Sequence, residues 1–197
     1  MVFIEEKGEI IGSDESLKGD TFGGIVVAGV KADDQIREKL IKLGVKDSKH
    51  LTDKKIPLLA KKIKKLTSCE VRNILPEQYN DFKEGQTALL NKLHQECYNY
   101  LKPGKHIVDK YPGCIVGDII KIKADQNYVE VAAASILARA YALEQIETLS
   151  RRAGFKVPKG STHVKLGLER LKRKDLNPKE FVKLNFKNVK NFFKQFS

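Results

Sequence analysis

Two adjacent carboxylates, Asp14 and Glu15, follow a short apolar segment and precede the apolar run at residues 24–30. This pattern predicts a hairpin of two strands with both acids at the end of the first strand. Carboxylate oxygens are the ligands that hard divalent cations prefer, so the pair is a candidate metal site. An ordinary acidic hairpin turn has the same composition, because turns are rich in Asp. Acids elsewhere in the chain must decide between the two interpretations.

Two later acids favour the metal site. Asp109 ends a short apolar run just before Pro112 and Gly113, which predicts a second strand end. Asp125 precedes the alanine-rich segment 131–134, and small side chains allow a helix to lie close to a sheet. Such packing would bring Asp125 toward the strand ends. We therefore predict that the catalytic residues and metal ligands are the same four acids: Asp14, Glu15, Asp109 and Asp125.

Four acids of this kind favour metal-assisted hydrolysis. The four histidines stand in no recognisable Ser-His or Cys-His arrangement, so a side-chain nucleophile is not indicated. Clustered carboxylates repel one another, and divalent ions such as Mg²⁺ or Mn²⁺ offset that repulsion. Two such ions would activate water on one side of a phosphodiester and stabilise the leaving oxygen on the other.

The motifs, taken in order along the chain, resemble those of the type 2 ribonucleases H. They are Asp14-Glu15, Asp47-Ser48-Lys49, Val108-Asp109, Ala124-Asp125 and the alanine-rich segment 131–139. Further stretches are more similar to the ribonuclease HIII branch than to ribonuclease HII: residues 76–80, 88–94, 154–160 and 183–188. The resemblance covers nearly the whole chain, and no single short motif carries it.

This resemblance implies an endonuclease that hydrolyses the RNA strand of RNA–DNA hybrids and leaves 3′-hydroxyl and 5′-phosphate ends. It places Ser16, Lys18 and Gly19 near the ribose, whose 2′-hydroxyl distinguishes RNA from DNA. It assigns phosphate contacts to Ser48, Lys49 and Thr87. The resemblance to ribonuclease HIII also implies a preference for runs of ribonucleotides. Incision at single embedded ribonucleotides, as in ribonuclease HII, is the alternative.

The sequence departs from the family pattern at three places. Leu17 stands where the family usually has the first glycine of a Gly-x-Gly motif, and Thr87 stands where an asparagine is expected. Ribonucleases HIII also carry an N-terminal domain resembling the TATA-binding protein. Because this sequence starts almost directly at the predicted catalytic strand, we expect that domain to be missing.

Positive charge is concentrated near the C-terminus. The formal net charge is +12, and residues 151–197 hold 14 Lys and Arg against 3 Asp and Glu. A basic field of this size attracts a polyanion, although a solvated basic face is the simpler alternative. The residues after Asn177 and Pro178 predict one helix over 178–194 with apolar residues at helical spacing. Its lysines are expected to be available to phosphates: Lys179, Lys183, Lys187, Lys190 and Lys194.

Apolar patterns predict an α/β protein with a ribonuclease H-like fold, in which a mixed sheet is flanked by helices and followed by a basic helical region at 151–197. The expected strands are 9–14, 23–31, 68–75, 105–109 and, more weakly, 115–122. The expected helices are 34–43, 53–66, 85–101, 128–153, 163–173 and 178–194. A chain of 197 residues is most simply one domain spanning 1–197. Ser135, within the alanine run, is expected to serve helix packing.

Other classes of protein remain open. The departures at Leu17 and Thr87 leave room for a non-catalytic module that binds hybrids, and the four acids argue against it. Residues 18–24 suggest a phosphate-binding loop only weakly, because an apolar strand follows instead of a helix. The chain shows neither a signal peptide nor a membrane span, and its three cysteines lack a metal-binding spacing. We expect a cytoplasmic monomer that binds RNA–DNA hybrid and no membrane.

Overall fold

The computed structural model describes residues 3–4, 7–45 and 51–195. They form a sheet of five strands with the order β3-β2-β1-β4-β5. The strands are β1 (Ile10–Ser16), β2 (Ile25–Ala32), β3 (Cys69–Ile74), β4 (Lys105–Asp109) and β5 (Ile119–Lys121). The α-helices are α1 (Asp34–Lys42), α2 (Ile56–Leu66), α3 (Pro76–Asp81), α4 (Gln86–Leu101), α5 (Val129–Ala153), α6 (Val164–Arg173) and α7 (Lys187–Lys194). Short 3₁₀ turns are η2 (Ala124–Gln126) and η3 (Pro178–Glu180).

The chain divides into two compact units. Unit 1 comprises residues 1–16, 27–72 and 84–140, and unit 2 comprises residues 17–26, 73–83 and 141–197. In unit 1, β4 lies between β1 and β5 and runs parallel to both. The predicted α/β fold with a mixed sheet and flanking helices is confirmed.

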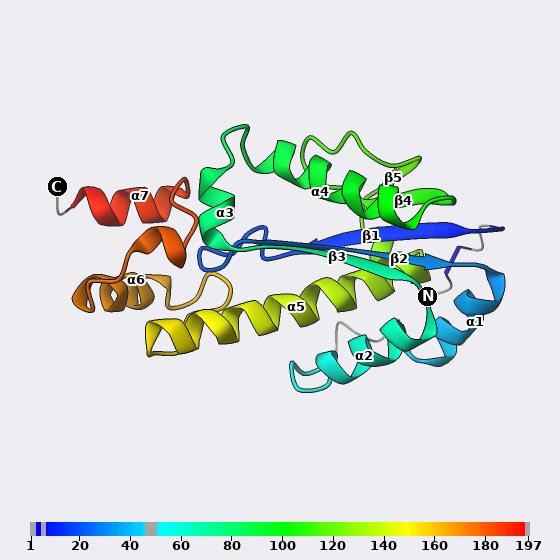
Figure 1. The fold of residues 1–197 in the computed structure, drawn as a ribbon, viewed down its shortest axis with the longest axis horizontal. Helices are drawn as coiled ribbons and strands as arrows, with labels where there is room; N and C mark the ends of the chain where they lie inside the picture. The colour runs from blue at the N-terminus through cyan, green and yellow to red at the C-terminus, as the bar shows by residue number, and fades with distance from the viewer. Residues whose placement is uncertain (1–2, 5–6, 46–50, 196–197) are drawn as a thin grey trace. The chain divides into compact units, whose positions relative to one another are not determined.

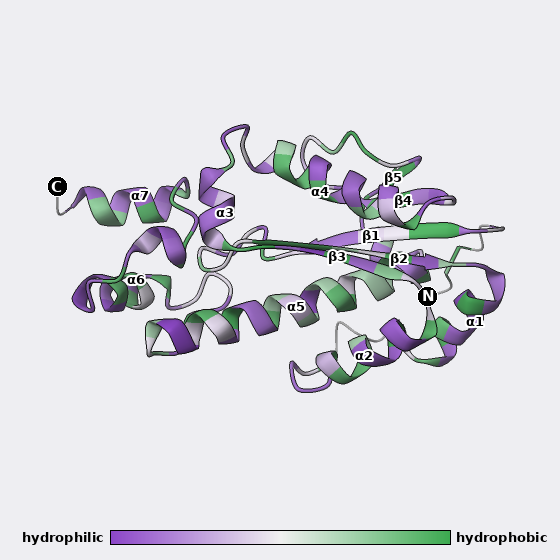
Figure 2. Ribbon diagram, viewed as in Figure 1, coloured by the Kyte–Doolittle hydropathy of each residue, from purple (hydrophilic) through white to green (hydrophobic). Residues whose placement is uncertain are grey.

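Helices cover both faces of the sheet in unit 1 (Figure 1). On one face, a Cβ at Gly12 would lie 2.4 Å from the backbone N of Val131 in α5. On the other, a Cβ at Gly29 would lie 2.9 Å from Leu101 Cδ1 in α4. Since a side chain at either position would collide with a helix, glycine in the strands permits this close packing. Both hydrophobic and hydrophilic residues lie along α2, as expected for a helix with one buried face (Figure 2).

The predicted strands and most of the predicted helices correspond to elements of the structure. Helix α3 was not expected from the sequence. Its first residue is Pro76, where no amide hydrogen is needed, and Gln78 Oε1 accepts a hydrogen bond from Leu75 N at 2.9 Å. In the part of the chain that the structure describes, no helix is long and apolar enough to cross a membrane.

The prediction of one helix over 178–194 is wrong. In unit 2 the turn η3 ends at Glu180, Val182 forms an isolated antiparallel bridge with Phe22, and α7 starts only at Lys187. The apolar spacing of residues 181–192 is compatible with one long helix and also with the observed 3₁₀ turn, bridge and short helix. The pairing of Val182 with Phe22 favours the observed arrangement. As a consequence Lys183, expected to face phosphates, is completely buried.

Candidate active site

The parallel pair β1 and β4 brings two of the predicted acids side by side. Ser13 is aligned with Val108 in this pair, so the next residues along, Asp14 and Asp109, continue the same register. Neighbouring strands lie about 4.8 Å apart. The alignment therefore places both carboxylates near the carboxyl ends of two neighbouring strands in unit 1. The sequence predicted a strand that ends at residue 14. In the structure β1 continues to Ser16, so both Asp14 and Glu15 lie within the strand.

Asp14 lies on the face of the sheet that α5 covers. Side chains alternate between the faces of a strand, and Asp14 shares its face with Gly12, on which the start of α5 packs. One turn further along α5, the side chain of Ser135 makes a hydrogen bond with the Asp14 carboxylate. Glu15 N also donates to Asp14 Oδ1, at 2.7 Å. Ser135 thus does more than serve helix packing, because it orients the carboxylate.

Glu15 lies on the opposite face, toward α4. His94 Nε2 lies 3.4 Å from Glu15 Oε2, and its ring is completely buried. The Ser13 hydroxyl lies 2.7 Å from His94 Nδ1 and 2.8 Å from His106 Nε2. Burial and the neighbouring His94 lower the pKa of His106 to about 4, so this ring is neutral at physiological pH. Because a hydroxyl can both donate and accept, Ser13 links the two imidazole rings into one buried network behind Glu15.

Sequence reasoning missed this network. Its partners are 81 and 93 residues apart in the chain, so local patterns do not link them. One signal was available: Ser13 and Glu15 are two residues apart in a strand and therefore share a face.

Asp109 and Asp125 are connected through the backbone. Ala124 N donates to Asp109 Oδ1 at 2.7 Å, and Asp125 is the next residue of the turn η2. This turn directly precedes α5, as the sequence predicted for the start of the alanine-rich helix. Asp125 is half-buried, so part of its surface is open to solvent.

The electrostatics of the site fit a cation. Burial, together with repulsion from Glu15 and Asp109, raises the pKa of Asp14 well above its usual range, while its hydrogen bonds with Ser135 and Glu15 N lower it. The acids are therefore close enough to destabilise one another's charge. Among the described residues, no group of three or more His, Cys, Asp and Glu side chains is arranged to hold a metal ion by itself. Mg²⁺ commonly binds through one or two carboxylates while substrate phosphates and water complete its ligands, so this donor set suits such an ion.

The structure describes some of the residues that are predicted to contact nucleic acid, and others lie outside its described ranges. Thr87 lies at the start of α4, is exposed, and its hydroxyl donates to Pro112 O at 3.4 Å. The N-terminal end of a helix carries unpaired amide groups and favours anions. Ser16 is the half-buried last residue of β1. Ser48 and Lys49 lie outside the described residues, so their assignment stays a prediction.

Lys18 and Gly19 belong to a turn in unit 2, in which Asp20 N donates to Leu17 O at 3.1 Å. Lys18 is half-buried and Gly19 is exposed. A Cβ at Gly19 would meet nothing within 4 Å, so the turn presents bare backbone to its surroundings. Leu17 has a φ of 66°, in the left-handed region that favours glycine. The backbone at Leu17 thus has the conformation that suits the glycine of the related motif.

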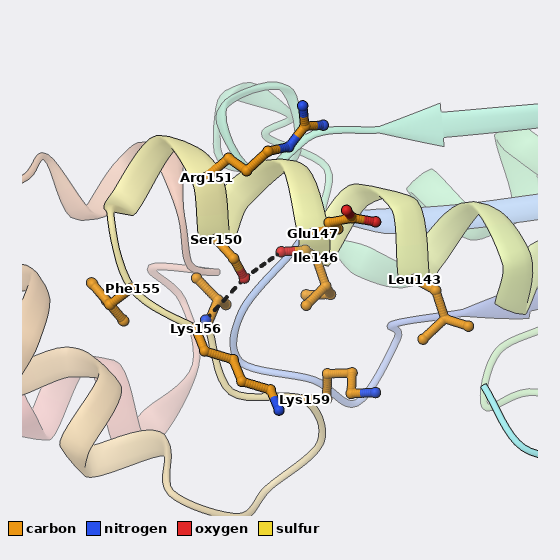
Figure 3. A pocket seen from close by; sticks show the side chains of 9 residues that line it. Leu143, Ile146, Glu147, Ser150, Arg151, Phe155, Lys156 and Lys159 are labelled. Carbon is orange, nitrogen blue, oxygen red and sulfur yellow. Dashed lines mark hydrogen bonds between the residues drawn. The ribbon is translucent and has the colours of Figure 1, made fainter. Parts of the chain in front are cut away.

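Unit 2 also contains a cavity of about 450 Å³ (Figure 3). Its walls include Leu143, Ile146 and Phe155. The Ser150 hydroxyl donates to Ile146 O at 2.7 Å and accepts from Val157 N at 3.0 Å, so its hydrogen bonds are made within the protein. None of the predicted acids lines this cavity, and we do not assign catalysis to it.

Comparison with known proteins agrees with this geometry. A family model described as ribonuclease HII matches residues 11–189. A ribonuclease HIII of Limosilactobacillus fermentum is 35% identical, and the alignment covers 91% of this chain and 67% of that protein. The crystal structure of Bst-RNase HIII in complex with Mn²⁺ matches with a TM-score of 0.83 and 31% identity, covering 95% of this chain and 70% of that one. The ribonuclease HII in the PCNA complex of Archaeoglobus fulgidus matches with a TM-score of 0.81 and 29% identity, covering 93% and 96%.

Proposed function

Because this chain belongs to the ribonuclease HII family and is a ribonuclease H hydrolase, we propose that it cleaves the RNA strand of RNA–DNA hybrids with the help of divalent metal ions. One observation carries the assignment of the site. Burial and repulsion from the nearby Glu15 and Asp109 raise the pKa of Asp14, which supports the proposal that these acids share a metal site.

Asp14, Glu15, Asp109 and Asp125 are the residues that would hold Mg²⁺ or Mn²⁺. When bound, such ions would polarise the scissile phosphate, lower the pKa of an attacking water and stabilise the leaving oxygen. Ser135 fixes the orientation of the Asp14 carboxylate. His94, held by Ser13, lies 3.4 Å from Glu15 Oε2 on the opposite face of the sheet. Products with 3′-hydroxyl and 5′-phosphate ends follow from this reaction.

We assign the nucleic-acid contacts to the residues that the family resemblance indicates: Ser16, Lys18, Gly19, Ser48, Lys49 and Thr87. The backbone of the 16–19 segment would approach the ribose, where Gly19 leaves space, and Lys18 would contact a phosphate or the ribose. Ser48, Lys49 and Thr87 would bind phosphates of the hybrid. Asn91, on the same helix as Thr87, supports the neighbouring loop, because its Oδ1 accepts hydrogen bonds from Tyr111 and from Ile115 N. We expect the enzyme to act as a monomer.

Cleavage of labelled RNA–DNA hybrid tests this proposal. Asp14→Asn and Asp109→Asn should lower turnover by about a thousandfold or more, because each removes a ligand charge from a shared metal site. Binding of hybrid should change little, since phosphate affinity arises elsewhere. Near wild-type turnover in either variant would contradict the site. Wild-type protein that binds hybrid without cleaving it would favour a non-catalytic binding module.

Substrate choice separates the two branches of the family. The last tyrosine of the chain is Tyr141, and residues 151–197 contain only phenylalanine as an aromatic residue. The resemblance implies that ribonuclease HII uses an additional tyrosine near its C-terminal region to sense the deoxyribose beyond a single ribonucleotide, and we infer that residues 151–197 offer no such tyrosine. A hybrid with a run of ribonucleotides should be cleaved much faster than a duplex with one embedded ribonucleotide. Equal rates on the two substrates would indicate the specificity of ribonuclease HII.

A further inference from the structure

Lys183 is a fully buried lysine in unit 2, and its side chain reaches the turn at residues 17–20. Its Nζ donates to Leu17 O at 2.8 Å and to Asp20 O at 2.5 Å. The side chain is 0% exposed, so it has no access to the phosphates of a substrate. Both hydrogen bonds end on backbone carbonyls of a single turn, which makes the lysine a brace for that turn.

Aromatic rings surround the same ammonium group. Nζ lies 5.5 Å from the ring centroid of Tyr79 and 5.2 Å from that of Phe186. Ring faces stabilise a cation, and two carbonyl oxygens accept its hydrogens. Burial nevertheless lowers the pKa of Lys183 to about 7, partly opposed by Asp20. A methionine would fill this space without that desolvation cost, but it would donate no hydrogen bond to the turn, so the lysine stands here for the two carbonyl groups that it contacts.

The segment that carries Lys183 is anchored to the same part of the chain. Lys183 N donates to Thr21 O at 3.0 Å, and Asn188 Nδ2 donates to Thr21 Oγ1 at 2.8 Å. From the other side, Asn80 Nδ2 donates to Val182 O at 2.8 Å. Hydrogen bonds therefore hold the backbone that carries the lysine to Thr21 on one side and to Asn80 on the other.

The turn itself needs support. Leu17 is buried and has a left-handed backbone, which costs a residue with a side chain about 1 kcal/mol. Leu17 O accepts hydrogen bonds from both Asp20 N and Lys183 Nζ. These two hydrogen bonds stabilise the conformation that glycine would adopt freely.

We propose that Lys183 is a positioning residue for RNA recognition, which holds the 17–20 turn so that its open backbone at Gly19 meets the ribose. This inference rests on the proposed function. It assigns the lysine a role in substrate affinity through the turn, with no contact to the nucleic acid or to the reacting atoms. Loss of the brace should therefore raise KM and leave kcat nearly unchanged.

Lys183→Met tests this role, with Lys165→Met as the matched control because Lys165 is exposed on α6. In Lys183→Met, KM for hybrid should rise about tenfold, as expected for one or two lost hydrogen bonds, with kcat within about threefold of wild type. Hydrogen exchange of the peptide containing residues 17–21 should accelerate in Lys183→Met. Neither change should appear in Lys165→Met.

Lys183→Gln keeps an amide donor and should give a smaller rise in KM than Lys183→Met. This variant also provides the measurement if Lys183→Met fails to fold. Unchanged KM and unchanged exchange in the folded Lys183 variants would overturn the proposal. If wild-type protein cleaves no hybrid, the proposed function fails, and the exchange measurement still decides whether Lys183 braces the turn.

Discussion

Asp14 and Glu130 are both carboxylates buried in unit 1, and their surroundings carry opposite charge. Asp14 faces the carboxylates Glu15 and Asp109, which raise its pKa further. Glu130 Oε1 accepts a hydrogen bond from Arg37 Nε at 2.6 Å, and this guanidinium lowers a pKa that burial raises. A buried acid paired with a cation of the protein is neutralised internally. A buried acid among other acids is neutralised either by a proton or by a cation from outside, which distinguishes a structural pair from a site that can bind a metal ion.

Breaking the internal pair should have the largest effect on stability. Glu130→Gln leaves the Arg37 side chain, which is only 8% exposed, without its buried counter-charge. We expect the free energy of unfolding to fall by about 3 kcal/mol. Urea unfolding of the metal-free protein measures this change. The double variant Arg37→Met with Glu130→Met should recover most of the loss, and a Glu130→Gln variant as stable as wild type would show that the pair is not needed.

Separating β1 from α5 should disturb the acidic site next most strongly. In Gly12→Ala the added Cβ would lie 2.4 Å from Val131 N, so the strand and the helix must move apart. We expect a loss of about 2 to 3 kcal/mol in unfolding free energy, together with reduced cleavage as Ser135 moves away from Asp14. Gly19→Ala is the matched control for stability, because a Cβ there meets nothing within 4 Å. Equal stabilities of the two variants would refute the close contact.

Replacing Asp14, the buried acid that lies among other acids, should change the free energy of unfolding less, and in the opposite direction. Asp14→Asn removes a buried charge that burial, Glu15 and Asp109 all disfavour, so the metal-free variant should be more stable than wild type. The pKa of Asp14 in the folded state is above its value of 3.8 when unperturbed. Its ionisation therefore costs stability as pH rises through that folded pKa, and the advantage of Asp14→Asn should be present at about pH 8 and vanish near pH 4. A variant less stable than wild type at the higher pH would contradict this electrostatic account.

The sequence predicted those parts of the site that depend on local pattern. Apolar runs ending in acids located Asp14, Glu15 and Asp109 on strands, and the alanine run placed Asp125 just before α5. These signals succeed because the apolar run of a buried strand and the small side chains of a closely packed helix are visible within a few residues. The alignment of Asp14 with Asp109 then follows from the pairing of parallel strands, which is a property of the fold.

Tertiary contacts decide the parts that the sequence did not predict. The segment after Pro178 has helical spacing, yet Val182 pairs with Phe22 and Lys183 turns inward to the 17–20 turn. The histidine network behind Glu15 joins β1 to α4 and β4 over more than eighty residues. In both cases buried polar groups find partners far away in the chain, and periodicity contains no information about such partners.

The central claim is that divalent metal ions supply the counter-charge of the acidic site, and titration of metal-free protein with Mn²⁺ or Mg²⁺ tests it most directly. The temperature of unfolding of the wild type should rise with metal concentration, since a hundredfold excess over Kd adds about 2.7 kcal/mol to stability. Lys165→Met should respond like wild type. Asp14→Asn and Asp109→Asn, which lack one ligand charge, should respond far less at the same concentrations. A wild-type unfolding temperature that does not respond to either ion, or an equal rise in Asp14→Asn, would contradict the account.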